Sequence, residues 1–286
     1  MSPAISILSF FLAFLPVPGS SDPNSQQAYV KDLLSQRKEI RKKMERVMGP
    51  FPSDDRRVPL EIKTLSEEKL DGYIRRKITF RAEAGDRVPA WLLIPLGGPA
   101  GSARPAGPRP AMLCLHQTVA IGKDEPVGLG RQESKKQALH LVKRGYICLA
   151  PDYPSFGEYR YDFKSSPFAS GSMKAIWNCS RAIDLLESMP EVDRKRIGVI
   201  GHSLGGHAGM FAAAFDDRIA VVVTSCGFTG FHHYYGGNLK GWTSDRYMPR
   251  IASDFGNDPR KMPFDFEDVL TAIAPTAVLH QLAFEG

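Results

Sequence analysis

One stretch decides the fold of this chain: Ile197-Gly198-Val199-Ile200-Gly201-His202-Ser203-Leu204-Gly205-Gly206. Its apolar first half predicts a buried strand, and the small residues that follow at 207–214 predict a helix. A strand, a sharp turn and a helix with a serine at the apex form the G-x-S-x-G pattern of a nucleophile elbow. Gly201 and Gly205 suit so tight a turn, because a side chain there would collide with neighbouring backbone. We therefore predict Ser203 as a nucleophile, with a structural glycine-rich turn as the alternative.

The length and the net charge of the chain limit the classes of protein to which it can belong. Its 286 residues are enough for one large α/β domain, and it carries a net charge of +6. The densest basic stretch, residues 31–46, has apolar side chains at close to helical spacing, which predicts a helix over about 26–48 with a solvated basic face. A nucleic-acid or anionic-surface site is the alternative. No aromatic residue interleaves with these charges, so we expect no nucleic-acid partner.

The first residues have the pattern of an export signal. Residues 4–17 are apolar and a polar stretch follows, which is too short for a comfortable membrane span but typical of a secretory h-region. We predict a signal peptide over 1–20 and a periplasmic or extracellular location, with no stable membrane span. No Lys or Arg precedes the run, so an uncleaved anchor or a disordered leader is the alternative.

The four cysteines give no sign of a metal site. They are Cys114, Cys148, Cys179 and Cys226, and none stands in a C-x-x-C spacing. We expect buried free thiols and no metal or other cofactor. A disulfide stays open if the protein is exported.

Strand-like and helix-like segments alternate after residue 73. Two segments with Gly85-Asp86 between them predict a hairpin, and the later strands alternate with helices over about 131–143 and 172–188 and with the helix that follows the elbow. This order predicts an α/β fold, a mostly parallel sheet with helices on both faces. We assign 21–72 to an N-terminal helical extension and 73–286 to the α/β domain. An aromatic-rich insert at about 228–266 is expected to cover the mouth of the site, or to be a surface subdomain with a small core of its own.

In such sheets ligands bind at the carboxyl ends of the strands. The segments that reach those ends are residues 116–118, 152–154, Ser203 and 226–228. A site at Ser203 is therefore expected from the sheet as well as from the motif.

The stretch from about 73 to 275 resembles an α/β-hydrolase of the dienelactone hydrolase or acetyl xylan esterase-like group. The resemblance rests on residues 112–118, 149–154 and 192–206. It implies hydrolysis of a carboxylic ester, on a small molecule or a sugar, through an acyl-enzyme on Ser203. A peptidase or acyltransferase on the same fold stays open.

The resemblance also implies where an oxyanion would be held. One donor would be the backbone N–H of Leu204, directly after the nucleophile, and the second would be that of Gln117 or Thr118.

Three polar residues near these segments are interpreted as structural. His202 belongs to the elbow, and a base must approach the serine from a separate loop. His207 lies about one helical turn after Ser203, and we interpret it as a packing residue. Asp152 stands in a Pro-Asp-Tyr-Pro turn, which explains it without catalysis.

The triad acid and base are not identified. In this family the acid usually follows the seventh strand and the histidine the eighth, and residues 277–280 look like the seventh strand. We therefore expect a fold cut short before its last strand, as in a truncated or frameshifted gene product. None of His207, His232, His233 and His280 stands where the chain order expects a base, and Glu285 lies near the terminus.

Two other interpretations stay open. One is an enzyme with a rearranged base such as His280. The other is a non-catalytic binding protein of this fold that lacks the triad histidine.

Overall fold

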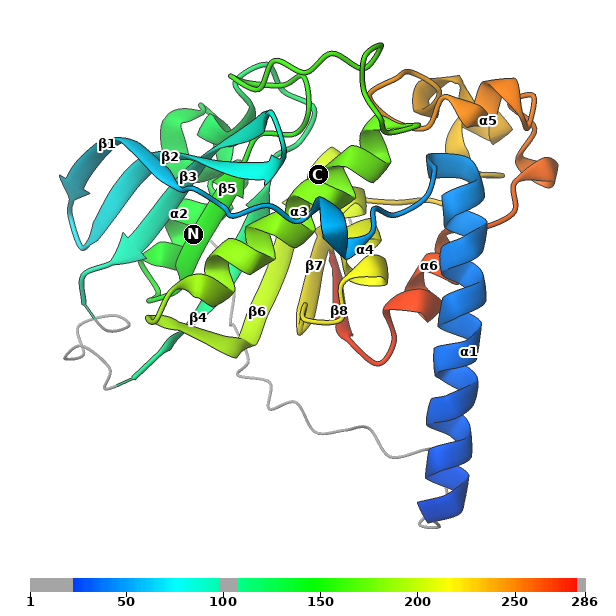
Figure 1. Cartoon of the computed structure of the whole chain (residues 1–286), viewed down its shortest axis with the longest axis horizontal. Helices are drawn as coiled ribbons and strands as arrows, with labels where there is room; N and C mark the ends of the chain where they lie inside the picture. The colour runs from blue at the N-terminus through cyan, green and yellow to red at the C-terminus, as the bar shows by residue number, and fades with distance from the viewer. Residues whose placement is uncertain (1–22, 98–106, 282–286) are drawn as a thin grey trace, which may run out of the picture.

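A mixed sheet forms the centre of the molecule. The structure, a computed structural model, describes residues 23–97 and 107–281, and within them eight strands pair in the order β1-β2-β3-β5-β4-β6-β7-β8 (Figure 1). The strands are β1 (Lys63–Leu70), β2 (Tyr73–Glu83), β3 (Asp86–Pro95), β4 (Arg109–Leu115), β5 (Ile147–Pro151), β6 (Val192–His202), β7 (Val221–Ser225) and β8 (Ala277–Gln281). β1, β2, β3 and β5 pair antiparallel, and every pairing from β5 through β4 to β8 is parallel. The α/β fold that we predicted is therefore confirmed, with a sheet that is parallel in four of its seven pairings.

Helices cover both faces of this sheet. They are α1 (Pro23–Met48), α2 (Gln137–Val142), α3 (Gly171–Ser188), α4 (Leu204–Phe215), α5 (Arg250–Ser253) and α6 (Phe266–Ile273). Successive strand side chains point to opposite faces, so Leu113 joins the larger core under α1, α3, α4 and α6, whereas Met112 and Cys114 join a smaller core under α2. Figure 1 shows α3 in front of the sheet and α1 along the right-hand side.

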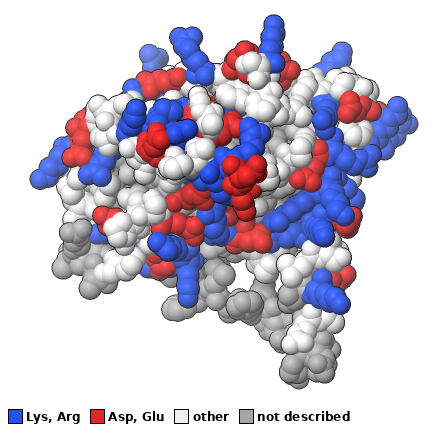
Figure 2. Space-filling view, in the orientation of Figure 1, with Lys and Arg blue, Asp and Glu red and all other residues white. Residues whose placement is uncertain are grey.

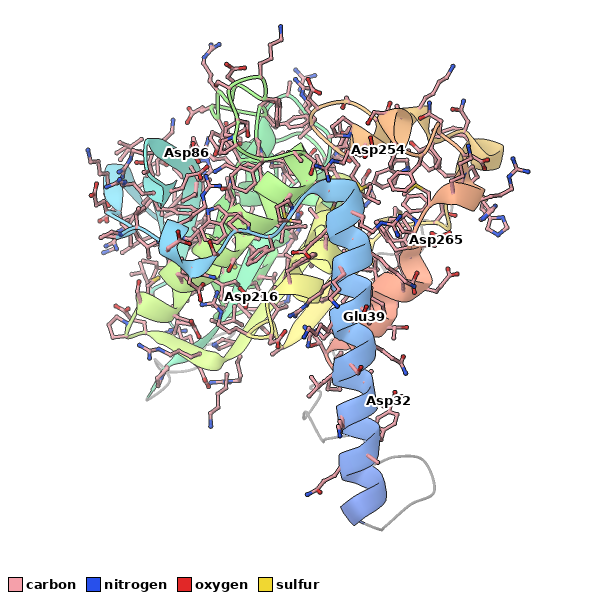
Figure 3. The ribbon with its side chains drawn as sticks, turned by 45° about the vertical axis from the view of Figure 1, so that its right-hand side comes forward. Asp32, Glu39, Asp86, Asp216, Asp254 and Asp265 are labelled. Atoms are coloured by element: carbon pink, nitrogen blue, oxygen red, sulfur yellow. The ribbon has the colours of Figure 1, made fainter. Side chains whose placement is uncertain are left out.

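The predicted helix over 26–48 is α1, and its basic face is partly paired. Arg37 and Arg41 both form ion pairs with Asp217, at 2.5 Å and 2.6 Å. Figure 2 shows the Lys and Arg side chains that gather over this helix. Figure 3 shows Asp32 and Glu39 along α1 and Asp265 at the start of α6, the helix against which α1 packs.

Three local features differ from the sequence-based expectation. β1 was not predicted, because almost all its side chains are exposed and it has no apolar alternation. It lies within 21–72, the predicted helical extension. The helix predicted over about 131–143 is shorter, since only Gln137–Val142 is α-helical. In the predicted hairpin, Asp86 already belongs to β3, and Gly85 at φ +76° forms the turn.

The predicted signal peptide over 1–20 lies outside the described residues. Within 23–97 and 107–281, no helix is long and apolar enough to cross a membrane.

Candidate active site

Ser203 stands at the apex of a strained turn between β6 and α4. Its φ of +52° and ψ of −115° are rare for a residue with a side chain, and such strain persists where the surrounding structure enforces it. The N–H of Ser203 donates to the carbonyl oxygen of Ser225 at 2.8 Å, which fixes the turn to β7. A Cβ at Gly201 would lie 2.2 Å from the Gly205 oxygen, and one at Gly205 would lie 2.2 Å from the Leu115 oxygen. The turn therefore has no room for side chains at either glycine.

The serine opens into a pocket with a volume of about 210 Å³. Thr118, Ser203 and Leu204, three of the predicted site residues, line it together. The other lining residues are His207, Cys226, Gly227, Phe228, Thr229, Tyr234, Gly241, Trp242 and Tyr247. Gln117 is not among them, because its side chain donates to Glu125 Oε1 at 2.8 Å. Most of the remaining wall comes from the predicted insert at 228–266.

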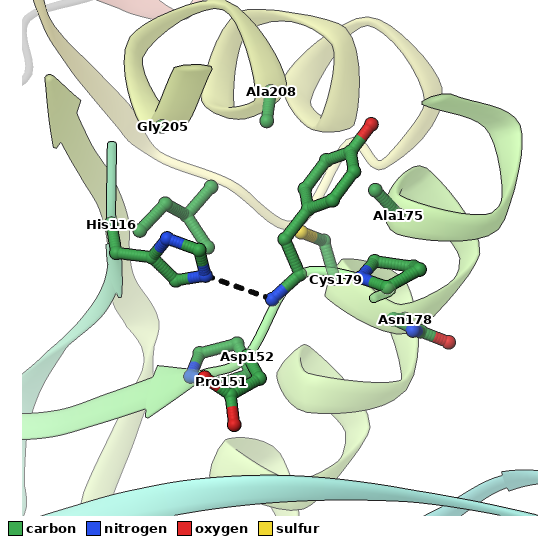
Figure 4. Close-up of a pocket in the computed structure, with 11 residues that line it drawn as sticks. His116, Pro151, Asp152, Ala175, Asn178, Cys179, Gly205 and Ala208 are labelled. Atoms are coloured by element: carbon green, nitrogen blue, oxygen red, sulfur yellow. Dashed lines mark hydrogen bonds between the residues drawn. The ribbon is translucent and has the colours of Figure 1, made fainter. Parts of the chain in front are cut away.

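His116 holds the loop after β4 in place. Its Nε2 accepts the N–H of Tyr153 at 2.9 Å (dashed in Figure 4), so Nδ1 carries the proton and donates to the Gln117 carbonyl oxygen at 2.6 Å. Burial lowers the pKa of His116, which keeps the ring neutral. A cavity of only about 20 Å³ lies beside this ring, against α3 and α4.

Asp152 is a structural group in the loop after β5. Its side chain is fully buried and pairs with Lys123, also fully buried, at 3.0 Å. Asp152 also accepts the backbone N–H groups of Lys123 at 2.8 Å and Glu158 at 3.0 Å. The Lys123 contacts therefore join the loops after β4 and β5, and the Glu158 contact holds the loop after β5 itself. The sequence contains no local pattern for the Lys123 pair, because the partners are far apart along the chain.

The two histidines nearest Ser203 in sequence have different surroundings. His202 Nδ1 is hydrogen-bonded to the Ser225 hydroxyl at 3.1 Å, and burial followed by the charge of Lys135 lowers its pKa. His207 packs against Trp242 with ring centroids 4.9 Å apart, and burial lowers its pKa to about 3. His207 Nε2 and Trp242 Nε1 have no hydrogen-bond partner among the described residues.

His232, His233 and His280 are not among the residues that line the pocket. His232 and His233 are exposed and do not line the pocket. His280 lies on β8, and its ring is 4.6 Å from that of Phe228, a lining residue. Glu285 lies outside the described residues. No triad partner for Ser203 is therefore assigned within 23–97 and 107–281.

Among the described residues, the cysteines and the acidic groups form no recognisable metal site. All four cysteines are free, three are buried, and Cys226 is half-buried at the pocket wall with φ +50°. In the part of the chain that the structure describes, no group of three His, Cys, Asp or Glu side chains is placed to hold a metal ion.

A mixed sheet with a serine elbow at the carboxyl end of its parallel strands defines an α/β-hydrolase. A sequence model of the Abhydrolase family matches residues 23–171, just over half of the chain, and one described as glucuronyl esterase, fungi, matches residues 157–282. YtaP of Bacillus subtilis (strain 168), a protein named only as a hydrolase, is 30% identical over 235 residues, which is 77% of this chain and 74% of YtaP. The chain belongs to the Abhydrolase family.

Other relatives are named as carboxylic ester hydrolases. The 4-O-methyl-glucuronoyl methylesterase of Hypocrea jecorina is 29% identical over 131 residues, 40% of this chain and 28% of that protein. The solved glucuronoyl esterase from Solibacter usitatus superimposes with a TM-score of 0.62 and 22% identity, over 87% of this chain and 74% of that one. At this identity the solved structure supports the fold. The enzyme class common to these matches is carboxylic ester hydrolase.

Proposed function

We propose that this protein is a serine-dependent carboxylic ester hydrolase. Ser203 Oγ attacks the ester carbonyl, the alcohol leaves, and water then releases the acid from the acyl-enzyme. The observation that carries the proposal is the strained elbow, which presents Ser203 to a pocket shared with Thr118 and Leu204. Ester hydrolysis is also the chemistry for which several relatives are named.

The oxyanion would be held by two backbone N–H groups. Leu204 is the first residue of α4, so its N–H is one of the donors that a helix start leaves without a partner in the helix. The Gln117 carbonyl points at the His116 ring, and in a trans peptide the next N–H points the opposite way. This supports Thr118, a lining residue, as the second donor in preference to Gln117.

The proposal leaves the base open. Both ring nitrogens of His116 are engaged, and a pKa of about 3 makes His207 a poor proton acceptor at neutral pH. His280, one ring away from the pocket through Phe228, is the described histidine to test first.

We also propose that the substrate is a sugar-linked ester and that the protein is exported. Carbohydrate esterases among the relatives, such as the methylesterase of Hypocrea jecorina, support the first part. The apolar run at 4–17 supports the second.

Fluorophosphonate labelling followed by intact-mass measurement tests the activated serine. We expect one adduct on the chain and none on Ser203→Ala, whose kcat/KM on esters should fall at least about 1,000-fold. A folded chain that takes up no label would instead favour the non-catalytic binding protein.

A further inference from the structure

Two buried rings in the wall of the Ser203 pocket each carry a nitrogen that has no partner in the described part of the chain. His207 is 5% exposed and Trp242 8% exposed, and both line the pocket. Buried polar groups in folded proteins are nearly always hydrogen-bonded, yet His207 Nε2 and Trp242 Nε1 have no partner among residues 23–97 and 107–281. Since the two rings are 4.9 Å apart and both residues line the pocket, the rings belong to one patch of its wall.

This patch has a fixed position relative to the serine. His207 lies in the first turn of α4, and its N–H donates to the Ser203 carbonyl oxygen at 3.1 Å. Trp242 ends a short helical turn, Leu239–Trp242, in the aromatic insert. A substrate group at the patch would therefore lie beside the ester bond attacked at Ser203.

The chemistry of the patch selects its ligand. An indole N–H only donates, whereas a neutral imidazole nitrogen either donates or accepts, so the pair suits hydroxyl and ether oxygens. The low pKa of His207 keeps the ring neutral, and no Asp, Glu, Lys or Arg lines the pocket. The aromatic walls of Tyr234 and Tyr247 suit the apolar edge of a ring.

We propose that His207 and Trp242 form a subsite that binds the uncharged, hydroxyl-bearing part of the ester. They would thereby select polyhydroxylated esters over apolar esters of the same size. This inference rests on the proposed ester hydrolysis at Ser203 and adds the specificity-determining residues.

Binding to the Ser203→Ala chain separates recognition from turnover. The two probes are a mono-acetylated methyl xyloside and cyclohexyl acetate, which share the acetyl group and differ in the polar groups of the ring. Their Kd values are measured by ligand-observed NMR titration. Each of His207→Phe and Trp242→Phe, which keep an aromatic ring, should raise the Kd of the xyloside about 10-fold. The Kd of cyclohexyl acetate should change less than about 3-fold.

His233→Phe is the matched control, because His233 is an exposed histidine of the same insert outside the pocket lining. It should leave both Kd values unchanged. Equal weakening for both probes, or no weakening for either, overturns the subsite, provided that far-ultraviolet circular dichroism shows both variants folded.

Turnover of both probes by the unsubstituted chain is measured alongside. If it hydrolyses neither while the binding pattern holds, the proposed function fails and the subsite stands. If it hydrolyses both while the Kd values do not respond, the subsite fails alone.

Discussion

Two regions beside Ser203 differ in how their buried polar groups are bonded. One is formed by the loops after β4 and β5, of which Thr118 lines the pocket, and the other is the pocket wall formed by α4 and the aromatic insert. On the side of the loops after β4 and β5, His116, Lys123 and Asp152 all have partners. On the side of α4 and the aromatic insert, His207 and Trp242 each keep a ring nitrogen that has no partner among the residues that the structure describes. The first side has the properties of a scaffold, and the second those of a binding surface. An unpartnered buried polar group carries a penalty of about 1–3 kcal/mol, which a ligand site can offset.

The two buried histidines show the contrast within one residue type. Burial lowers the pKa of both His116 and His207, so both rings are neutral. His116 uses its two nitrogens to join Tyr153 to Gln117, whereas His207 Nε2 bonds to nothing that the structure describes. The comparison predicts that His116 acts on stability and geometry, and His207 on recognition.

The largest effect is expected on the scaffold side, at Lys123. Lys123→Met leaves the Asp152 carboxylate buried without its cation, so the free energy of unfolding should fall by about 3–5 kcal/mol. Urea denaturation measures this free energy. Lys195→Met, which changes an exposed side chain, is the control and should leave it unchanged. A loss of stability below about 1 kcal/mol would show that the loops after β4 and β5 do not depend on this ion pair.

Some features of these two regions can be predicted from the sequence and others cannot. The elbow was predictable in its geometry, because Gly201 and Gly205 are needed locally, within a few residues of the turn. The parallel strands were predictable from apolar runs such as 111–115, which are buried on both faces. β1 was not, since an exposed edge strand rich in Lys and Glu carries no apolar pattern.

The ion pairs and hydrogen bonds of the side chains were harder to predict from the sequence. The pairing of Lys123 with Asp152 depends on how two loops meet, which no local pattern encodes. His207 was interpreted as a packing residue, and it does pack against Phe211 and Trp242. Helical spacing, however, gives no information on whether a ring nitrogen finds a partner. The nucleophilic role of Ser203 and the oxyanion roles stay predictions.

A smaller effect is expected from the titration of His207. Its pKa is about 3 in the folded chain, against an ordinary value of 6.5. Below pH 6.5 the unfolded chain binds a proton that the folded chain does not, so stability is lost as the pH falls toward 3. Between pH 6.5 and about pH 4.5, His207→Phe should lose about 2 kcal/mol less stability than the unsubstituted chain.

Chemical denaturation at a series of pH values measures this difference. His233→Phe serves as the control and should follow the unsubstituted chain. Parallel pH profiles for His207→Phe and the unsubstituted chain would mean that solvent reaches the His207 ring, and would weaken the contrast with His116.

The smallest effect on stability is expected at His116, where a substitution should also lower kcat. His116→Phe keeps a ring in the site but leaves the Tyr153 N–H and the Gln117 carbonyl unpaired, which should lower the free energy of unfolding by about 1–2 kcal/mol. In the proposed mechanism the Gln117 carbonyl would then no longer be held, so the Thr118 N–H would lose its aim at the oxyanion. His116 is thus a positioning residue. Its loss should lower kcat on 4-nitrophenyl acetate at least about 10-fold with little change in KM, because an oxyanion donor acts mainly in the transition state. A rise in KM with kcat unchanged would mean that His116, like His207, acts in substrate binding. The distinction between the scaffold side and the binding side would then no longer hold.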